Sequence, residues 1–274
     1  MEVIHVPDIF IYRGGTLRSL RGQYIVKGGE LHTFAAGSGI VQGGILYVLD
    51  GEDYAVRMVT GKQSVTIGIT ATEAMTLDWG DGAIETCNTG AASLTHNYSD
   101  NIDTHTVLIK GTAGAVTELY CQSNELMELD IAPCTALNIL HCGFNNLRVL
   151  NVTGNTKLTN IVCSDNRLTT LDIACNVELI ELRCNSNQLT RLNVSHNIRL
   201  VNLFCGNNQI SSLDLSYTTD LTLLNCVNIP ADQIYIANSL PDRTGIAAGN
   251  LLVSEIMTGV QNICTAKNWA ITVM

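Results

Sequence analysis

Aromatic side chains are scarce in this sequence of 274 residues, of which only 5% are Phe, Trp or Tyr. Charged residues are also few at 15%, whereas 46% are hydrophobic, so the core must be largely aliphatic. The 15 basic residues are outnumbered by 25 acidic ones, which gives a formal net charge of −10, and the sequence has no Lys/Arg cluster that could track phosphates. We therefore expect no nucleic acid and no anionic membrane surface as a partner.

Long apolar runs are missing as well. No stretch approaches the roughly 20 continuous apolar residues of a membrane-spanning helix, so we expect no membrane insertion. The first ten residues, MEVIHVPDIF, have neither a basic n-region nor an apolar h-region. We accordingly expect no signal peptide in this chain.

Motifs that carry catalysis or bind metals are also lacking. The ten cysteines contain no C-x-x-C pair, the six histidines show no H-E-x-x-H spacing, and AGSG at 36–39 is not a nucleophile elbow. The sequence has no P-loop and no dinucleotide fingerprint. We predict that the protein is not an enzyme, has no cofactor and has no metal site.

What the sequence does have is an internal repeat of 21 residues. The unit is L-x-x-L-x-C-x-x-N-x-L-x-x-L-x-V/I-x-x-N-x-x, with five full copies in register. Its cysteine column is Cys121, Cys142, Cys163, Cys184, Cys205 and Cys226. Its first asparagine column is Asn124, Asn145, Asn166, Asn187 and Asn208.

The spacing within the unit predicts the path of the chain. The L-x-C segment is expected to be a short parallel strand whose Leu and Cys point inward. The first Asn marks a bend, because its amide can bond backbone groups that would otherwise be buried without partners. The thiols could instead form a metal or disulfide ladder, but zinc needs four ligands around one point and disulfides between parallel neighbours would be strained. We therefore predict that the cysteines form a core column.

The repeats resemble those of bacterial leucine-rich-repeat surface proteins of the internalin-like kind, especially the 21-residue variety with cysteine in place of an inward aliphatic residue. The resemblance covers residues 116–226. It implies a mainly β fold, a right-handed solenoid of short parallel strands, which we place at residues 115–232. It also implies an extracellular or cell-surface binding protein, and it says little about the ligand.

Residues 63–114, before the repeats, form a second recognisable segment. LDWGDG at 77–82, HNY at 96–98 and TVLI at 106–109 resemble the polycystic-kidney-disease-like β-sandwich, with the Trp unusually close to GDG. The Asp/Gly turn could suggest calcium, but it lacks the alternating acidic ligands of a calcium loop. We predict a tight hairpin turn that uses glycine for positive φ.

The two ends of the chain complete the organisation. Residues 1–62 contain β-like runs separated by Gly-Gly pairs and predict a small β-rich module that could form a homo-oligomer. Residues 233–274 predict a C-terminal cap with strands at 250–254 and 269–273 and one helix at 254–267. A cap is needed because a terminal coil exposes apolar side chains and strand edges. The 63–114 segment would cap the other end.

The candidate binding site is the outward face of the repeat strands. Exposed aromatic, His and Arg side chains aligned on a rigid surface are typical of interface anchors, although exposed strand positions also favour bulky residues in general. The predicted ligand-binding residues are Glu118, Tyr120, His141, Glu181, Arg183 and Phe204, with Phe144 just past its strand. A regular Asp/Asn column is expected to be solvated and not catalytic; it consists of Asp130, Asn151, Asp172, Asn193 and Asp214.

These inferences indicate a non-enzymatic binding or adhesion protein that presents a rigid repeat face to a protein or glycan. It would act at a bacterial surface or on a phage particle. The alternative is a structural decoration or spacer subunit of a virion or surface assembly, without a ligand of its own.

Overall fold

The computed structural model describes residues 54–99, 102–256 and 259–274 in full, together with the backbone of five strands between residues 2 and 48. The chain divides into two compact units, Met1–Asp53 and Tyr54–Met274. In the first unit, one sheet has the antiparallel order β1-β2-β3 and a separate hairpin joins β4 to β5. These strands are β1 (Glu2–Arg13), β2 (Thr16–Lys27), β3 (Glu30–Phe34), β4 (Gly39–Gln42) and β5 (Ile45–Val48).

The boundary between the units lies earlier than the predicted boundary after residue 62. Strand β6 (Tyr54–Thr60) belongs to the second unit, where it pairs antiparallel with β11 (His105–Lys110) and β13 (Leu126–Asp130). Its inward side chains, including Val56 and Met58, are completely buried. The apolar alternation of β6 therefore serves the core of the second unit, so residues 54–62 do not form part of an N-terminal module.

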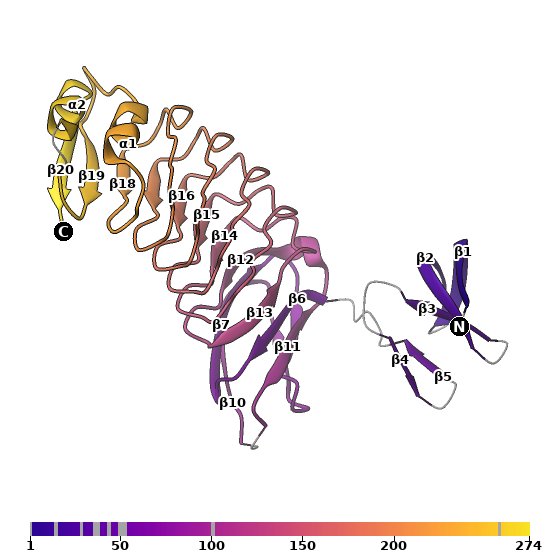
Figure 1. Ribbon diagram of the computed structural model, residues 1–274. Helices are drawn as coiled ribbons and strands as arrows, with labels where there is room; N and C mark the ends of the chain where they lie inside the picture. Colours follow the sequence, from indigo (N-terminus) through magenta and orange to yellow (C-terminus); the bar gives the residue numbers. More distant parts are fainter. Residues whose placement is uncertain are drawn as a thin grey trace. The chain divides into compact units, whose positions relative to one another are not determined.

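Two sheets form a β-sandwich at the start of the second unit (Figure 1). One has the order β13-β6-β11-β8-β9, with β8 at Met75–Asp78 and β9 at Ile84–Cys87. The other begins with β10 (Gly90–Asn97) and β7 (Ser64–Ala71) and continues into the repeats, because β7 pairs antiparallel with β12 (Val116–Tyr120). The segment expected to cap the solenoid thus shares a sheet with it and covers the open edge of its first strand.

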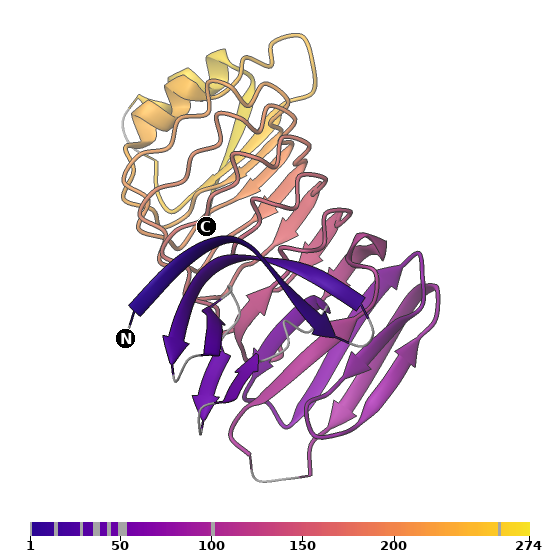
Figure 2. The same ribbon diagram turned by 90° about the vertical axis from the view of Figure 1, so that its right-hand side faces the viewer.

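The repeat region forms a ladder of short parallel strands, one per 21-residue coil, visible as successive arrows in Figure 2. Neighbouring strands pair in register exactly one period apart, as with Leu140 opposite Ile161. After β12 the strands are β14 (Ile139–His141), β15 (Asn160–Val162), β16 (Glu181–Arg183), β17 (Asn202–Phe204) and β18 (Leu223–Asn225). The predicted mainly β leucine-rich-repeat solenoid is confirmed.

The cysteine column lies in the core of this solenoid, as predicted. All six thiols are buried and free, and the inward leucines beside them are buried as well. Burial raises the pKa of Cys121, Cys163 and Cys226 to about 12, because an ionised thiolate would lose its hydration. The thiols therefore stay protonated at neutral pH and act as small apolar side chains.

The first asparagine column ties each coil to the previous one. The Nδ2 atom of Asn145 donates to the carbonyls of Cys121 and Cys142 at 3.0 and 2.9 Å, and its Oδ1 accepts the backbone N–H of Leu126 at 2.9 Å. The same pattern recurs at Asn166, Asn187 and Asn208. The predicted bend residue thus satisfies backbone groups that no water reaches.

The C-terminal cap contains the predicted helix and, before it, a second helix that the sequence did not predict. Helix α1 (Gln233–Ser239) begins at Asp232, whose side chain accepts the backbone N–H groups of Ile234 and Tyr235. It was missed because a seven-residue helix is too short to show a helical period. Helix α2 (Val260–Ala266) starts only after Gly259, which has a φ of 95°. Strands β19 (Gly249–Val253) and β20 (Trp269–Val273) extend the parallel ladder.

Among the residues described, no helix has the length and apolar character needed to cross a bilayer.

Candidate functional site

The outward side chains of the repeat strands form one surface, which we call the strand face. Because the strands pair in register, these side chains stand in two columns with neighbours about 4.8 Å apart. The first column is Glu118, Ile139, Asn160, Glu181, Asn202 and Leu223, and the second is Tyr120, His141, Val162, Arg183, Phe204 and Asn225. Arg183 is exposed, and the others are half-buried against one another.

One cluster lies at the N-terminal end of the strand face. The rings of Tyr120 and His141 meet edge to face with 4.9 Å between their centroids. The hydroxyls of Tyr120 and Thr70 both donate to Glu118 Oε2, at 3.1 and 2.9 Å. Thr70 belongs to β7, so the sandwich helps to hold this cluster in place.

Burial sets the charge state of this cluster. It lowers the pKa of His141, and the attraction of the nearby Glu181 and Glu118 carboxylates only partly opposes that effect. Burial and the Glu118 carboxylate raise the pKa of Tyr120. At neutral pH the cluster therefore presents a neutral imidazole and a neutral phenol around one carboxylate.

A second cluster lies further along the same face, beyond β15. The Arg183 guanidinium sits 4.4 Å from the centre of the Phe204 ring, and its Nε donates to Glu181 at 2.5 Å. Asn202 also donates to Glu181, at 3.4 Å. A cation over an aromatic face at an exposed site contributes about 0.5–1 kcal/mol, enough to bias the arginine toward this position.

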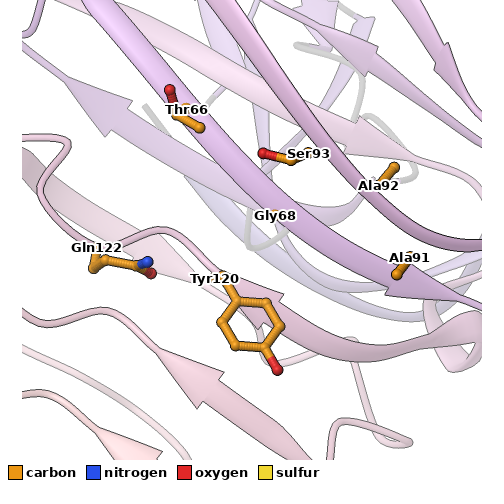
Figure 3. Close-up of a pocket in the computed structure, with 7 residues that line it drawn as sticks. All are labelled: Thr66, Gly68, Ala91, Ala92, Ser93, Tyr120 and Gln122. Atoms are coloured by element: carbon orange, nitrogen blue, oxygen red, sulfur yellow. The ribbon is translucent and has the colours of Figure 1, made fainter.

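A shallow hollow of about 510 Å³ adjoins the first cluster, where the sandwich meets the solenoid (Figure 3). It is lined by Thr66, Gly68, Ala91, Ala92, Ser93, Tyr120 and Gln122. Gly68 allows Tyr120 to pack closely against β7 at this hollow, because a Cβ atom at position 68 would lie only 3.0 Å from the Cβ of Tyr120. Sequence reasoning missed the hollow, since it assigned β7 and β10 to a separate domain.

Phe144 lies just beyond β14, at the rim of the strand face. Its φ is 55° and its side chain is 62% exposed. Every coil has a left-handed residue here; the others are Ser123, Asp165, Ser186, Asn207 and Asn228. Small polar residues tolerate this conformation better than a bulky one. Phe144 therefore carries backbone strain without gaining burial in return, an arrangement that is common at functional sites.

The structure places six of the seven predicted residues in these two clusters and Phe144 on the rim. The first cluster holds Glu118, Tyr120 and His141, and the second holds Glu181, Arg183 and Phe204. Asn160 and Val162 lie between the two clusters, on β15. That these residues bind a ligand stays a prediction.

The Asp/Asn column on the other side of the coil has a structural role that the sequence did not reveal. In each coil one side-chain oxygen accepts the backbone N–H two residues further on, as Asp172 does from Ala174 at 3.0 Å. These turns redirect the chain after the second inward leucine. The column is solvated, as expected, with Asp130 half-buried and the other four exposed.

The carboxylates of the WGDG turn are also engaged within the protein. Gly80 and Gly82 have φ of 85° and 95°, which confirms the predicted glycine hairpin turn. Asp78 pairs with Lys110 at 2.9 Å, and Asp81 meets His96 Nε2 at 2.7 Å. Within the described ranges, no group of three or more His, Cys, Asp or Glu residues is placed to hold a metal ion.

Comparison with known proteins finds similarity only among solved structures, since no protein-family model and no curated protein matches the chain. The functional domain of InlJ from Listeria monocytogenes, which includes a cysteine ladder, is 28% identical with a TM-score of 0.47; the match covers 59% of this chain and 36% of that one. The internalin InlF from Listeria monocytogenes is 20% identical (TM-score 0.46, 55% and 45% covered).

A leucine-rich-repeat protein of Leptospira interrogans is also 20% identical, with a TM-score of 0.44 and coverage of 55% of this chain and 41% of that one. This chain therefore spans less than half the length of each of these three bacterial repeat proteins.

Proposed function

We propose that the protein is a non-enzymatic binding protein that presents its strand face to a protein or glycan. The observation that carries this proposal is that, in both clusters of the strand face, the aromatic and arginine side chains are already ordered by contacts with their neighbours. Tyr120 rests against His141, and Arg183 lies between Glu181 and Phe204. Aromatic and arginine side chains dominate binding energy at interfaces, and anchors that are ordered in advance lose less entropy on binding.

The footprint would extend beyond the repeats. The hollow beside Tyr120 and the exposed ring of Phe144 flank the first cluster, so a ligand could contact β10, β7, β12 and β14 together. The continuous ladder supports this idea, because it fixes the spacing of side chains along the whole surface.

The proposal also covers where the protein acts and what the segments before the repeats do. An extracellular or cell-surface setting agrees with the internalin-like repeats, and a phage particle is the second setting. The first unit, residues 1–53, would supply attachment or homo-oligomerisation, the role that the sequence suggested for residues 1–62. For the polycystic-kidney-disease-like assignment of 63–114, support comes from the buried Trp79, which stacks on His96 at 5.0 Å and accepts the Tyr98 hydroxyl at its carbonyl at 2.8 Å.

A triple substitution tests the binding role. Tyr120→Ala, Arg183→Ala and Phe204→Ala together remove both clusters while leaving every inward residue in place. We expect capture of the partner to be lost, measured with a glycan array and a panel of cell-surface ectodomains as probes. The folded state should persist, since substitutions of this kind on the surface cost little compared with core changes.

A matched control removes three exposed side chains from the opposite flank, Lys157→Ala, Val177→Ala and Ile198→Ala. This variant should capture the partner like the unmodified protein. Capture that survives the strand-face triple substitution would contradict the proposal. If the unmodified protein captures nothing from either probe set, the result favours the alternative, a spacer or decoration subunit.

A further inference from the structure

The flank of the solenoid that follows the asparagine bends carries arginines without carboxylate partners. We call this surface the arginine flank and define it by Arg148, Val149, Arg167, Thr169, Gln188 and Arg191. The backbone N–H of Arg167 donates to the Leu147 carbonyl at 2.8 Å, so Arg167 and Arg148 lie on neighbouring coils. All three arginine side chains are exposed.

The arginine flank is unusual because arginines elsewhere in the protein form ion pairs. On the opposite flank, Arg199 pairs with Glu178, which lies one coil before it. Arg183 pairs with Glu181, and Arg57 pairs with Glu128. The repeat can therefore place opposite charges on adjacent coils, and it does so away from the arginine flank.

The arginines of the flank have no such partners. The guanidinium of Arg167 donates to the neutral amide oxygen of Asn146 at 2.9 Å, and in the described structure neither Arg148 nor Arg191 forms an ion pair. Two neighbouring like charges repel, so this arrangement does not stabilise the fold. Unpaired cations are unexpected in a chain with a net charge of −10.

Arg148 and Arg167 line a hollow of about 640 Å³, together with Val149, Thr169 and Gln188. That volume lies within the roughly 300–1,000 Å³ of small-ligand sites. The Val149 side chain is 73% exposed, and the side chains of Thr169 and Gln188 take part in none of the hydrogen bonds within the described structure. The hollow thus offers two forked cations, a hydroxyl, an amide and one aliphatic surface.

The length of the positively charged surface limits the size of the ligand that the arginine flank can bind. At the same positions, the first coil has Glu125 and Glu128, and the fifth coil has Gln209, Ser211 and Ser212. The basic surface therefore spans three coils, or about 10 Å at the spacing of parallel strands. This is too short to follow a nucleic acid backbone, and it suits one or two anionic groups on a compact molecule.

We propose that the arginine flank binds an anionic saccharide. Arg148 and Arg167 would hold its carboxylate or sulfate, because the planar guanidinium fork matches such oxyanions. Thr169 and Gln188 would bond sugar hydroxyls, and Val149 would contact the apolar face of the ring. This site is separate from the strand face and does not depend on the function proposed above.

Calorimetry on the full chain tests the site with four probes: tetragalacturonate for carboxylates, a heparin-derived tetrasaccharide for sulfates, neutral maltotetraose, and a hexaglutamate peptide. At least one anionic saccharide should bind with a Kd in the micromolar to millimolar range, and maltotetraose should not bind. The combined Arg148→Gln and Arg167→Gln substitutions should weaken binding by about tenfold or more.

The control variant, Lys157→Gln with Arg199→Gln, removes two positive charges from the opposite flank and should keep full affinity. The strand-face triple variant should also bind the saccharide normally, which separates this site from the strand face. The proposal is overturned if neither anionic saccharide binds, if the control variant loses as much affinity as the arginine variant, or if only hexaglutamate binds.

Discussion

At the scale of single residues, two side chains per coil decide how the backbone turns. The buried asparagine, such as Asn166, donates to the carbonyls of Cys142 and Cys163 and accepts the N–H of Leu147. The residue just before it takes a left-handed conformation in every coil. The role of the asparagine could be predicted from spacing and chemistry, whereas the left-handed position could not, because Ser, Asp, Asn and Phe occupy it without a common side-chain type.

Phe144 gives a prediction at this scale. Phe144→Asn should raise the free energy of unfolding by about 1 kcal/mol, because asparagine tolerates the left-handed conformation that strains a bulky residue. Urea unfolding measures the change. The control is Ser186→Asn, which introduces asparagine at the equivalent position of another coil. It replaces a small polar residue and should therefore change the free energy of unfolding less.

If Phe144 is a ligand contact, the stabilised variant should also bind its partner more weakly. A Phe144→Asn variant that is no more stable than the unmodified protein would show that the ring is held by favourable contacts. The strain argument for its function would then fail.

At the scale of the coil, the column of buried thiols couples stability to pH. In the unfolded chain a cysteine ionises near its ordinary pKa of about 9, whereas burial raises the pKa of Cys163 to about 12 in the folded protein. Between these values the unfolded state binds fewer protons than the folded state. The stability that the buried, protonated thiols confer is therefore complete below pH 9 and is lost as the pH rises toward 12.

We expect the free energy of unfolding, measured with urea between pH 7 and pH 10.5, to fall above about pH 9. Cys163→Ala should make the fall less steep, because one shifted thiol is gone. Cys175→Ala is the matched control, since Cys175 is exposed and its removal should leave the slope unchanged. The half-buried Tyr120, whose pKa is also raised, would add a decline in the same direction in all three proteins. Equal slopes for all three proteins would contradict the account.

The elements differ in how well the sequence predicts them. Strands β14 to β18 and both inward columns could be predicted because the repeat is periodic and each coil contacts only its neighbours. Strand β6 could not be assigned correctly, because its pairing partners in β11 and β13 lie 45 to 73 residues further along the chain. The hollow at Gly68 and the arginine flank were missed for the same reason: each depends on residues brought together by folding, at different positions of their units.

At the scale of the second unit, one sheet of ten strands runs from β10 through the repeats to β20. The sandwich covers its first repeat strand by antiparallel pairing, and the C-terminal strands continue it in parallel. Both ends of the hydrophobic core are thereby closed, so the middle of the solenoid is a fixed platform. Its outward side chains differ from coil to coil while the inward ones repeat. This pattern is typical of repeat scaffolds, in which the inward residues form the core and the outward residues can vary.

The central claim, that function resides on the strand face, is tested most directly by blocking that face without removing any anchor. Val162 lies between the two clusters and points outward, so Val162→Arg would place a long charged side chain in the middle of the surface. We predict that this single change abolishes partner capture while the unfolding midpoint stays within a few degrees of the original. Thr219→Arg, on the opposite flank, should leave capture intact; capture that persists in Val162→Arg would contradict the account.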